Sequence, residues 1–409
     1  MLIVQKKIKS KYENFNKCNI CHSRKLKQVF SMGKHTPADT FVSKKKINLL
    51  IDEVDLDCFF CKKCLNIQLK KTLNQNIKYN RLDYSYSSSN SKKSRSYLDE
   101  YYLLIKKYFK KNSGKILEIG ANDGYLIKKF RSKFNLLYSC EASKFWSRKL
   151  IRENIVSINN IFEKIPKLFK KKHKESFDII IANNVFNHSH NARKFFKNLK
   201  FLINKDGLIF IEVPYSKWMI EKKKFELVYL EHINYYNLNT FKKLCEDSGL
   251  KINKIFFKNY HGKMIRIMIS KKNTKFSYNN LLAKEKFYFK NLNKFKEFKK
   301  NIKIRKNRFL KKIKNLRKKN NQIVAIGASA KTSSLLNFFN LDNQDISFIT
   351  DNAPQKVGKF IPNKKIPIKS DEALSNIKNA YVFFSTWNIS DFVKKKIIKI
   401  NKSIKIIKY

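Results

Sequence analysis

Short apolar runs alternate with segments of helical spacing through the middle of the chain. The run at 177–182 is almost continuously apolar, which is typical of a strand buried on both faces of a parallel sheet. A helical pattern at 192–202 separates it from the next apolar run. Repeated alternation of this kind predicts an α/β domain with a doubly wound parallel sheet. The expected strands are 115–119, 136–139, 177–182 and 208–213, and a helix is expected over 97–109.

The same pattern recurs on a smaller scale near the end of the chain. A short apolar strand at 322–326 enters the loop 327–333, and a helix is expected to run to Phe339. A further strand is expected at 346–350. This order predicts a second, smaller α/β domain. Its loop has neither the dinucleotide glycine pattern nor a Walker pattern, so neither NAD nor ATP is assigned to it.

A long basic segment at 284–319 lies between these two regions. Its apolar residues, which include Phe287, Phe289 and Phe298, mostly recur every three or four positions. The spacing predicts amphipathic helices with an aromatic inner face. A membrane-surface helix is one interpretation. The favoured one is a pair of connecting helices that pack on the protein's own domains.

The composition indicates a globular protein of two or three domains, with 409 residues of which 43% are hydrophobic. No apolar run approaches the ~18 residues that cross a bilayer, and the first residues lack a signal-peptide core, so a cytoplasmic protein is expected. The net charge of +59 first suggests a nucleic-acid or anionic-membrane partner. Because the lysines are spread over nearly every segment, a solvated lysine surface is favoured and no nucleic-acid partner is expected.

Five of the seven cysteines fall within the first 64 residues. Cys18 and Cys21 form one C-x2-C knuckle, and Cys61 and Cys64 form a second. Four thiolates from two knuckles make a closed tetrahedral zinc site, which stabilises a small module and leaves no open coordination position. We therefore predict a structural Zn²⁺ ion. Cys58 forms an alternative knuckle with Cys61, but it lies in an alternating, strand-like stretch and is expected to be buried.

The loop after the first central strand carries the pattern Glu118-x-Gly120-x-Asn122-x-Gly124. A strand that ends in a glycine-bearing turn and opens a helix lets backbone N–H groups approach a nucleotide-like ligand. The acid-first pattern differs from the dinucleotide form and is the one seen in S-adenosylmethionine-dependent methyltransferases. Glu141 follows the second strand, where an acid usually binds the ribose hydroxyls.

Proton-transfer groups concentrate at Tyr229, Glu231 and His232, beyond the predicted central sheet. Histidine is the usual general base near neutral pH, and a nearby carboxylate can orient it. A tyrosine and serine strip near Tyr86 is either a polar linker or a loop that faces the substrate. In the second α/β domain, Lys331 at a helix start is a candidate phosphate ligand, and Asp351 stands at a strand end where ribose contacts occur.

These motifs together resemble bacterial S-adenosylmethionine-dependent sugar C-methyltransferases, which act on nucleotide-linked 4-keto deoxysugars. The resemblance covers nearly the full length and implies a zinc-binding module at 1–78, a methyltransferase domain at 79–272, connecting helices at 273–320 and a C-terminal Rossmann-like domain at 321–409. The matching stretches are Cys18 to Cys21, Cys61 to Leu69, Tyr84 to Ser88, Glu118 to Gly124, Asn183 to His188, Tyr229 to His232, His261-Gly262 with Arg266, Gly327 to Lys331, Asp351-Asn352 with Lys356 and Gly358, and Trp387-Asn388.

The resemblance also implies roles for individual residues. His232 matches the proposed catalytic base, while Tyr229, Glu231 and His188 match positions that orient the base or stabilise an enolate. The positions implied for binding S-adenosylmethionine are Glu118, Gly120, Asn122, Gly124, Glu141 and Asn183. The positions implied for the substrate are Tyr84, Tyr86, Lys331 and Asp351.

The chain departs from the family pattern at several positions. Leu230 replaces the first histidine of Tyr-His-Glu-His, Lys263-Met264 replace Gly-Ser after His261-Gly262, and Leu65 stands where glycine is usual. An aromatic–histidine pair expected after the serine strip is also missing. These differences leave open a non-catalytic protein that binds sugar nucleotides. The zinc knuckles and the net charge of +59 leave open a methyltransferase that acts on RNA.

Overall fold

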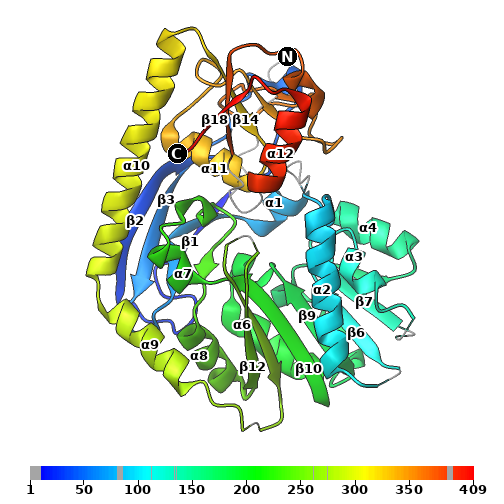
Figure 1. Cartoon of the computed structure of the whole chain (residues 1–409). Coiled ribbons are helices and arrows are strands. Elements are labelled where there is room, and N and C mark those ends of the chain that lie inside the picture. Colours follow the sequence, from blue (N-terminus) through cyan, green and yellow to red (C-terminus); the bar gives the residue numbers. More distant parts are fainter. Residues whose placement is uncertain are drawn as a thin grey trace, which may run out of the picture.

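A seven-stranded sheet forms the centre of the computed structural model (Figure 1). Its order is β12-β13-β10-β9-β6-β7-β8, and all neighbours are parallel except the pairs β10–β13 and β12–β13. The predicted doubly wound sheet is therefore confirmed, with an antiparallel edge. The strands are β6 (Lys115–Ile119), β7 (Leu136–Glu141), β8 (Val156–Asn159), β9 (Phe177–Asn183), β10 (Ile203–Pro214), β12 (Lys251–Lys258) and β13 (Met264–Ser270). The structure describes residues 11–80, 86–111, 113–132, 134, 136–260, 262–273, 275–384 and 390–409.

Both faces of this sheet are covered by helices, which explains the continuously apolar strands. Successive residues of a strand point to opposite faces. Ile116 accordingly packs in one core with residues of α2 and α4, and Leu117 packs in another with residues of α6 and α8. The helices of this domain are α2 (Lys92–Tyr108), α3 (Tyr125–Lys128), α4 (Lys144–Arg152), α5 (Lys167–Lys172), α6 (Ala192–Leu202), α7 (Ser216–Glu221) and α8 (Leu238–Ser248).

Helix α2 begins five residues before the start expected from its apolar spacing. Ser91 caps it, because the Ser91 side chain accepts from the Ser94 backbone N–H while Ser94 bonds back to the Ser91 N–H. This capping box satisfies otherwise unpaired N–H groups. The first turn carries two lysines and no apolar residue, so hydrophobic periodicity alone misses it.

A four-stranded antiparallel sheet, β11-β4-β3-β2, forms most of the N-terminal module. The edge strand β11 (Asn234–Tyr235) lies beyond β10 in the chain and pairs with β4. The module thus shares a sheet with the segment that follows the predicted catalytic motif. Its elements are β1 (Tyr12–Asn14), β2 (Leu26–His35), β3 (Val54–Cys61), β4 (Ile67–Leu69), β5 (Lys71–Leu73) and α1 (Gln75–Asn80), and β1 pairs with β5.

A five-stranded parallel sheet, β16-β15-β14-β17-β18, forms the C-terminal domain. The predicted second α/β domain is confirmed, although β15 begins at Phe348 rather than at Ile346. The elements are β14 (Gln322–Ile326), α11 (Ala330–Phe339), β15 (Phe348–Thr350), β16 (Ile368–Lys369), β17 (Ala380–Phe384), α12 (Ser390–Ile400) and β18 (Lys405–Ile407).

Two helices, α9 (Asn279–Lys290) and α10 (Asn293–Lys318), connect the central and C-terminal domains, and α10 runs alongside β2 (Figure 1). The apolar face of α10 is buried against the chain itself. Phe298 lies 4.7 Å from Phe30 of β2, measured between ring centroids, and Phe309 lies 4.7 Å from Phe339 of α11. The expected inner-face position of Phe287 is wrong, because 82% of its surface is exposed.

One apolar core joins these parts. It contains residues from β2 and β3, from 219–235, from α10 and from the C-terminal sheet. Within the described ranges, no helix is both long and apolar enough to span a membrane.

Candidate active site and metal centre

The loop after β6 bends sharply at the carboxyl end of the sheet. Gly120, Asn122 and Gly124 have positive φ angles of 67°, 53° and 75°. A Cβ atom on Gly120 would lie 2.8 Å from the Val185 side chain, so only glycine fits without a shift. The loop therefore packs closely on the segment that follows β9, and β6 lies between β7 and β9, where the strand order reverses. Ligands of open α/β sheets bind at such a switch point.

Two buried carboxyl groups flank this loop. Glu141, the last residue of β7, accepts hydrogen bonds from the N–H groups of Asn122 (2.9 Å) and Ser143 (2.8 Å). Each carboxylate oxygen has two acceptor sites, so Glu141 can also accept from ligand hydroxyls. Glu118 is buried in β6, and its Oε2 has no hydrogen-bond partner among the described residues. Burial, followed by repulsion from Asp123, raises the pKa of Glu118 well above its usual range.

The serine strip is bound to the same loop. Asp123 accepts from the hydroxyls of Ser87 (2.6 Å), Ser88 (2.7 Å) and Ser89 (2.9 Å), and Asn122 Oδ1 accepts from the Ser88 N–H (2.9 Å). Burial opposes ionisation of Asp123, but the hydrogen bonds from the serines outweigh it and lower its pKa. Sequence reasoning missed Asp123. The signals were an acid inside the loop after β6 and, separately, a run of serines that had no assigned partner.

The tyrosines of the strip are only partly described. Tyr84 lies outside the described residues. The Tyr86 carbonyl accepts from Asn122 Nδ2 (3.1 Å), and 37% of the residue's surface is exposed. The backbone of Tyr86 thus adjoins the loop after β6. The assignment of Tyr86 to the substrate stays a prediction.

His188 and His232 come from separate segments and meet near this sheet edge. Their ring centroids lie 5.3 Å apart. His188 ends the short helix η3 (Phe186–His188), which begins three positions after the end of β9. The Nδ1 atom of His188 lies 3.0 Å from the Tyr79 hydroxyl. Asn183 is the last residue of β9, and its Oδ1 accepts from Asn184 Nδ2 at 3.2 Å. Burial, with the nearby Lys78 ammonium, lowers the pKa of His188 to about 3, so its ring is neutral at pH 7.

The contacts of His232 fix which nitrogen carries its proton. Nδ1 lies 3.1 Å from the Leu227 carbonyl oxygen, which can only accept, so Nδ1 is the donor. Nε2 of the neutral ring is then unprotonated and accepts from the Tyr229 hydroxyl at 2.5 Å. Burial holds the pKa of Tyr229 well above its usual range, so this hydroxyl keeps its proton. The arrangement presents an acceptor nitrogen and a neutral donor side by side.

Glu231 faces the N-terminal module. Its Oε1 accepts from Lys78 Nζ at 2.7 Å and from the Ala38 N–H at 2.9 Å. A small cavity adjoins this pair. It is lined by Thr72, Leu73, Gln75, Lys78, Tyr79, His188, His190, Leu230, Glu231 and Ile233. Sequence reasoning missed Lys78, because nothing in its local pattern shows that α1 reaches the segment that carries Glu231.

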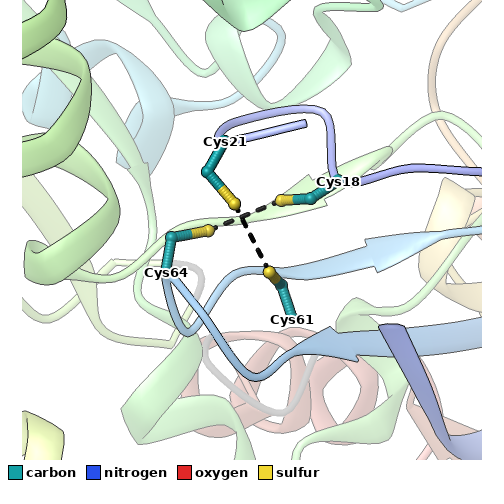
Figure 2. A group of neighbouring side chains, drawn as sticks. All are labelled: Cys18, Cys21, Cys61 and Cys64. Atoms are coloured by element: carbon teal, nitrogen blue, oxygen red, sulfur yellow. Dashed lines mark hydrogen bonds between the residues drawn. The ribbon is translucent and has the colours of Figure 1, made fainter. Parts of the chain in front are cut away.

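The four predicted zinc ligands converge (Figure 2). The sulfurs of Cys18, Cys21, Cys61 and Cys64 all lie within 4.8 Å of one another, and the pairs Cys18–Cys64 and Cys21–Cys61 are 3.5 Å apart. Tetrahedral zinc with Zn–S bonds of about 2.3 Å needs sulfurs about 3.8 Å apart, so the set fits Zn²⁺. Cys58, the alternative partner of Cys61, is buried in β3 and is not part of the cluster.

A left-handed residue directly follows each knuckle, His22 (φ 57°) after the first and Leu65 (φ 64°) after the second. This conformation explains why glycine would suit the position of Leu65. Hydrogen bonds connect the knuckles to the active centre. Asn19 Nδ2 donates to the Ser189 carbonyl at 3.2 Å, and Asn237 Nδ2 donates to the Leu65 carbonyl at 2.6 Å. The zinc site therefore supports the segment that carries His188.

Lys331 and Asp351 lie in the C-terminal domain. Lys331 is buried in the first turn of α11, and burial, partly offset by Glu226, lowers its pKa to about 8. Asp351 accepts from the N–H groups of Ala328 and Ala353, both at 2.9 Å, and so braces the loop before α11. Helix α11 also contacts the catalytic segment, because Ser334 Oγ donates to the Val228 carbonyl at 2.7 Å.

Comparisons with known proteins match three consecutive parts of the chain to family models. Residues 18–79 match a model described as "Putative zinc binding domain", and residues 92–255 match a methyltransferase domain. Residues 259–406 match a C-methyltransferase C-terminal domain. The chain is 22% identical to C-methyltransferase NovU of Streptomyces niveus over 397 residues, which cover 91% of this chain and 90% of that protein.

Solved structures match less than half of the chain. The PH0226 protein of Pyrococcus horikoshii is 15% identical, with 46% of this chain and 95% of that chain covered and a TM-score of 0.38. A magnesium protoporphyrin IX methyltransferase of Synechocystis is 10% identical, with 44% and 79% covered and a TM-score of 0.34.

Proposed function

Because the chain belongs to the S-adenosylmethionine-dependent C-methyltransferases that carry a zinc-binding domain and their own C-terminal domain, we propose that it methylates a carbon beside the ketone of a nucleotide-linked 4-keto deoxysugar. A carbon next to a ketone becomes nucleophilic only after a base removes its proton. The observation that carries the proposal is the orientation of His232, whose Nδ1 lies against the Leu227 carbonyl and whose Nε2 lies against the hydroxyl of Tyr229.

His232 is the proposed base. Its Nδ1–H is fixed on the Leu227 carbonyl, so the ring keeps one orientation while Nε2 takes up a proton. The C–H bond of the sugar breaks, the proton moves to Nε2 and the electron pair moves onto the ketone oxygen as an enolate. Tyr229 and His188 are the groups proposed to stabilise the enolate, since donors aimed at a developing oxyanion lower the barrier.

The methyl donor is assigned to the loop after β6. Glu118, Gly120, Asn122, Gly124 and Glu141 are its proposed contacts, with Asn183 at the neighbouring strand end. S-Adenosylmethionine supplies an electrophilic methyl carbon bonded to a sulfonium. The enolate carbon forms a new bond to that methyl carbon, and the electron pair of the breaking S–CH3 bond stays on sulfur. Holding both reactants in one cleft makes this step effectively unimolecular.

The nucleotide diphosphate is assigned to the C-terminal domain. Lys331, with a pKa of about 8, is mostly protonated at pH 7 and can pair with a phosphate. Asp351 is the proposed contact to the nucleoside, and Tyr84 and Tyr86 are the proposed contacts to the sugar. The net charge of +59 also favours phosphate-bearing substrates through electrostatic steering.

Transfer of labelled methyl groups tests the proposal. The purified protein is incubated with S-adenosylmethionine and a panel of nucleotide-linked 4-keto deoxysugars, with RNA as the alternative acceptor. Transfer to at least one sugar is expected, and transfer to RNA alone would refute the assignment. His232→Asn should lower kcat by at least about 10²-fold while S-adenosylmethionine still binds. His22→Asn is the matched control, because His22 is exposed and asparagine tolerates its positive φ.

A further inference from the structure

Helix α1 of the N-terminal module contacts both catalytic segments. Gln75 Nε2 donates to the His188 carbonyl at 3.1 Å, and the Tyr79 hydroxyl lies 3.0 Å from His188 Nδ1. Lys78 Nζ donates to Glu231 Oε1 at 2.7 Å. Three residues within one short helix therefore meet residues assigned to the reaction. The module does more than bind zinc, because it supplies part of the wall of the active centre.

The pair of Lys78 and Glu231 is deeply buried, with 6% and 7% of the two side chains exposed. Lys78 Nζ also donates to the Ala38 carbonyl at 2.6 Å, and the Ala38 N–H donates to Glu231 Oε1. Both partners and one peptide unit thus form a closed cluster. Removing one partner of such a pair leaves an uncompensated buried charge, which strongly favours neutralisation of the other.

The surroundings of Glu231 would otherwise favour its neutral form. Burial raises the pKa of Glu231, the Lys78 ammonium opposes this rise, and Asp39 adds to it. Glu231 Oε2 has no hydrogen-bond partner among the described residues, and Glu231 lines the cavity described above. The ionisable or charged groups around this carboxyl are Lys78 from α1, Asp39 from the loop after β2, Tyr79, Tyr229 and Tyr235, and the histidines that line the same cavity, His188 and His190.

We propose that Lys78 is a positioning residue of the active centre, which keeps Glu231 as an oriented carboxylate whose Oε2 accepts a hydrogen bond from a hydroxyl group of the substrate. The role of Oε2 rests on the proposed function. The role of Lys78 follows from the contacts of α1. A neutral Glu231 would carry a proton in the cavity where the substrate hydroxyl is proposed to bind. It would also no longer offset the positive charge that His232 gains on taking up a proton.

Infrared titration of the protein without substrate tests the role of Lys78. The carboxyl band of Glu231 is identified from the difference between wild type and Glu231→Gln. Lys78→Gln should move the protonation midpoint of this band to higher pH, whereas Lys78→Arg should leave it near the wild-type value. Lys364→Gln is the matched control, because Lys364 is a buried lysine of the C-terminal domain that bonds to Asn340. An unchanged midpoint in Lys78→Gln would overturn the proposal, whether or not a sugar substrate is found.

Kinetics with an accepted sugar provide the second arm. Lys78→Gln should move the acid limb of the kcat/KM profile to higher pH, and at a fixed pH below the limb the activity should fall about tenfold for every pH unit that the limb moves. Lys78→Arg should restore most of the wild-type profile. If Lys78 acts in folding alone, Lys78→Gln should lower the unfolding temperature and leave the acid limb in place. That result would contradict the proposal. Failure of the wild type on every sugar would instead refute the proposed function, while the titration still decides the role of Lys78.

Discussion

Replacing Gly120 with alanine tests the geometry of the loop after β6, to which we assign the methyl donor. The new Cβ would lie 2.8 Å from Val185 Cγ2, and the residue would have to keep a φ of 67°. The left-handed conformation costs an L-residue about 1–2 kcal/mol. Relieving an overpacked contact costs about 1–3 kcal/mol. The free energy of unfolding should therefore fall by about 2–5 kcal/mol.

Two further variants separate these contributions. Gly33 has a φ of 79°, and a Cβ there would meet no atom within 4 Å, so Gly33→Ala should show the backbone strain alone. Combining Gly120→Ala with Val185→Ala removes the contacting methyl group and should recover part of the loss. Denaturant midpoints measure all three variants. Equal losses for Gly120→Ala and Gly33→Ala would refute the contact between the loop and Val185.

Affinity for S-adenosylmethionine gives an independent measure of the same loop. If half of the contact energy of about 1–3 kcal/mol opposes the conformation that binds S-adenosylmethionine, the Kd of Gly120→Ala should rise about 2- to 12-fold, since about 1.4 kcal/mol corresponds to one decade. Gly33→Ala should bind as the wild type does. Calorimetric titration makes the comparison, and an unchanged Kd for Gly120→Ala would remove this loop from the donor site.

Two other predictions concern the metal and the serine strip. Cys61→Ala should lose its bound zinc and lower the unfolding temperature, whereas Cys58→Ala should keep its zinc, as measured by metal analysis; zinc loss in both would contradict the ligand set. Asp123→Asn should destabilise the protein by about 2 kcal/mol, because hydrogen bonds to a charged acceptor are lost. Since the pKa of Asp123 is lowered in the folded state, its contribution is present above its unfolded pKa and is lost as pH falls through the folded value. The difference between the free energies of unfolding at pH 7 and at pH 3 should therefore be smaller in Asp123→Asn than in the wild type. An equal difference would contradict this role.

Local sequence was sufficient for much of the fold. The strand at 177–182 is apolar except at Asp178, and helices cover both faces of β9. The two knuckles predicted the cysteine cluster, because two C-x2-C motifs in one short segment are typical of a metal site. The positive φ angles at Gly120 and Gly124 follow from residues that are local to the turn. Such features depend on neighbours in the chain, so a sequence pattern contains them.

Only the tertiary structure decided which distant residues surround the predicted base. Lys78 meets Glu231 across 153 positions, and Asn234 completes a sheet that begins in the N-terminal module. A lysine in a chain with 90 basic residues gives no sign that it is one of the few that are buried. Exposed and buried lysines have the same local sequence requirements, and burial is determined by what the fold places against them. The turn after β6 and the cysteine cluster were therefore predictable from the sequence, while the contact of Lys78 with Glu231 became visible only when α1 was placed against the segment that carries Glu231.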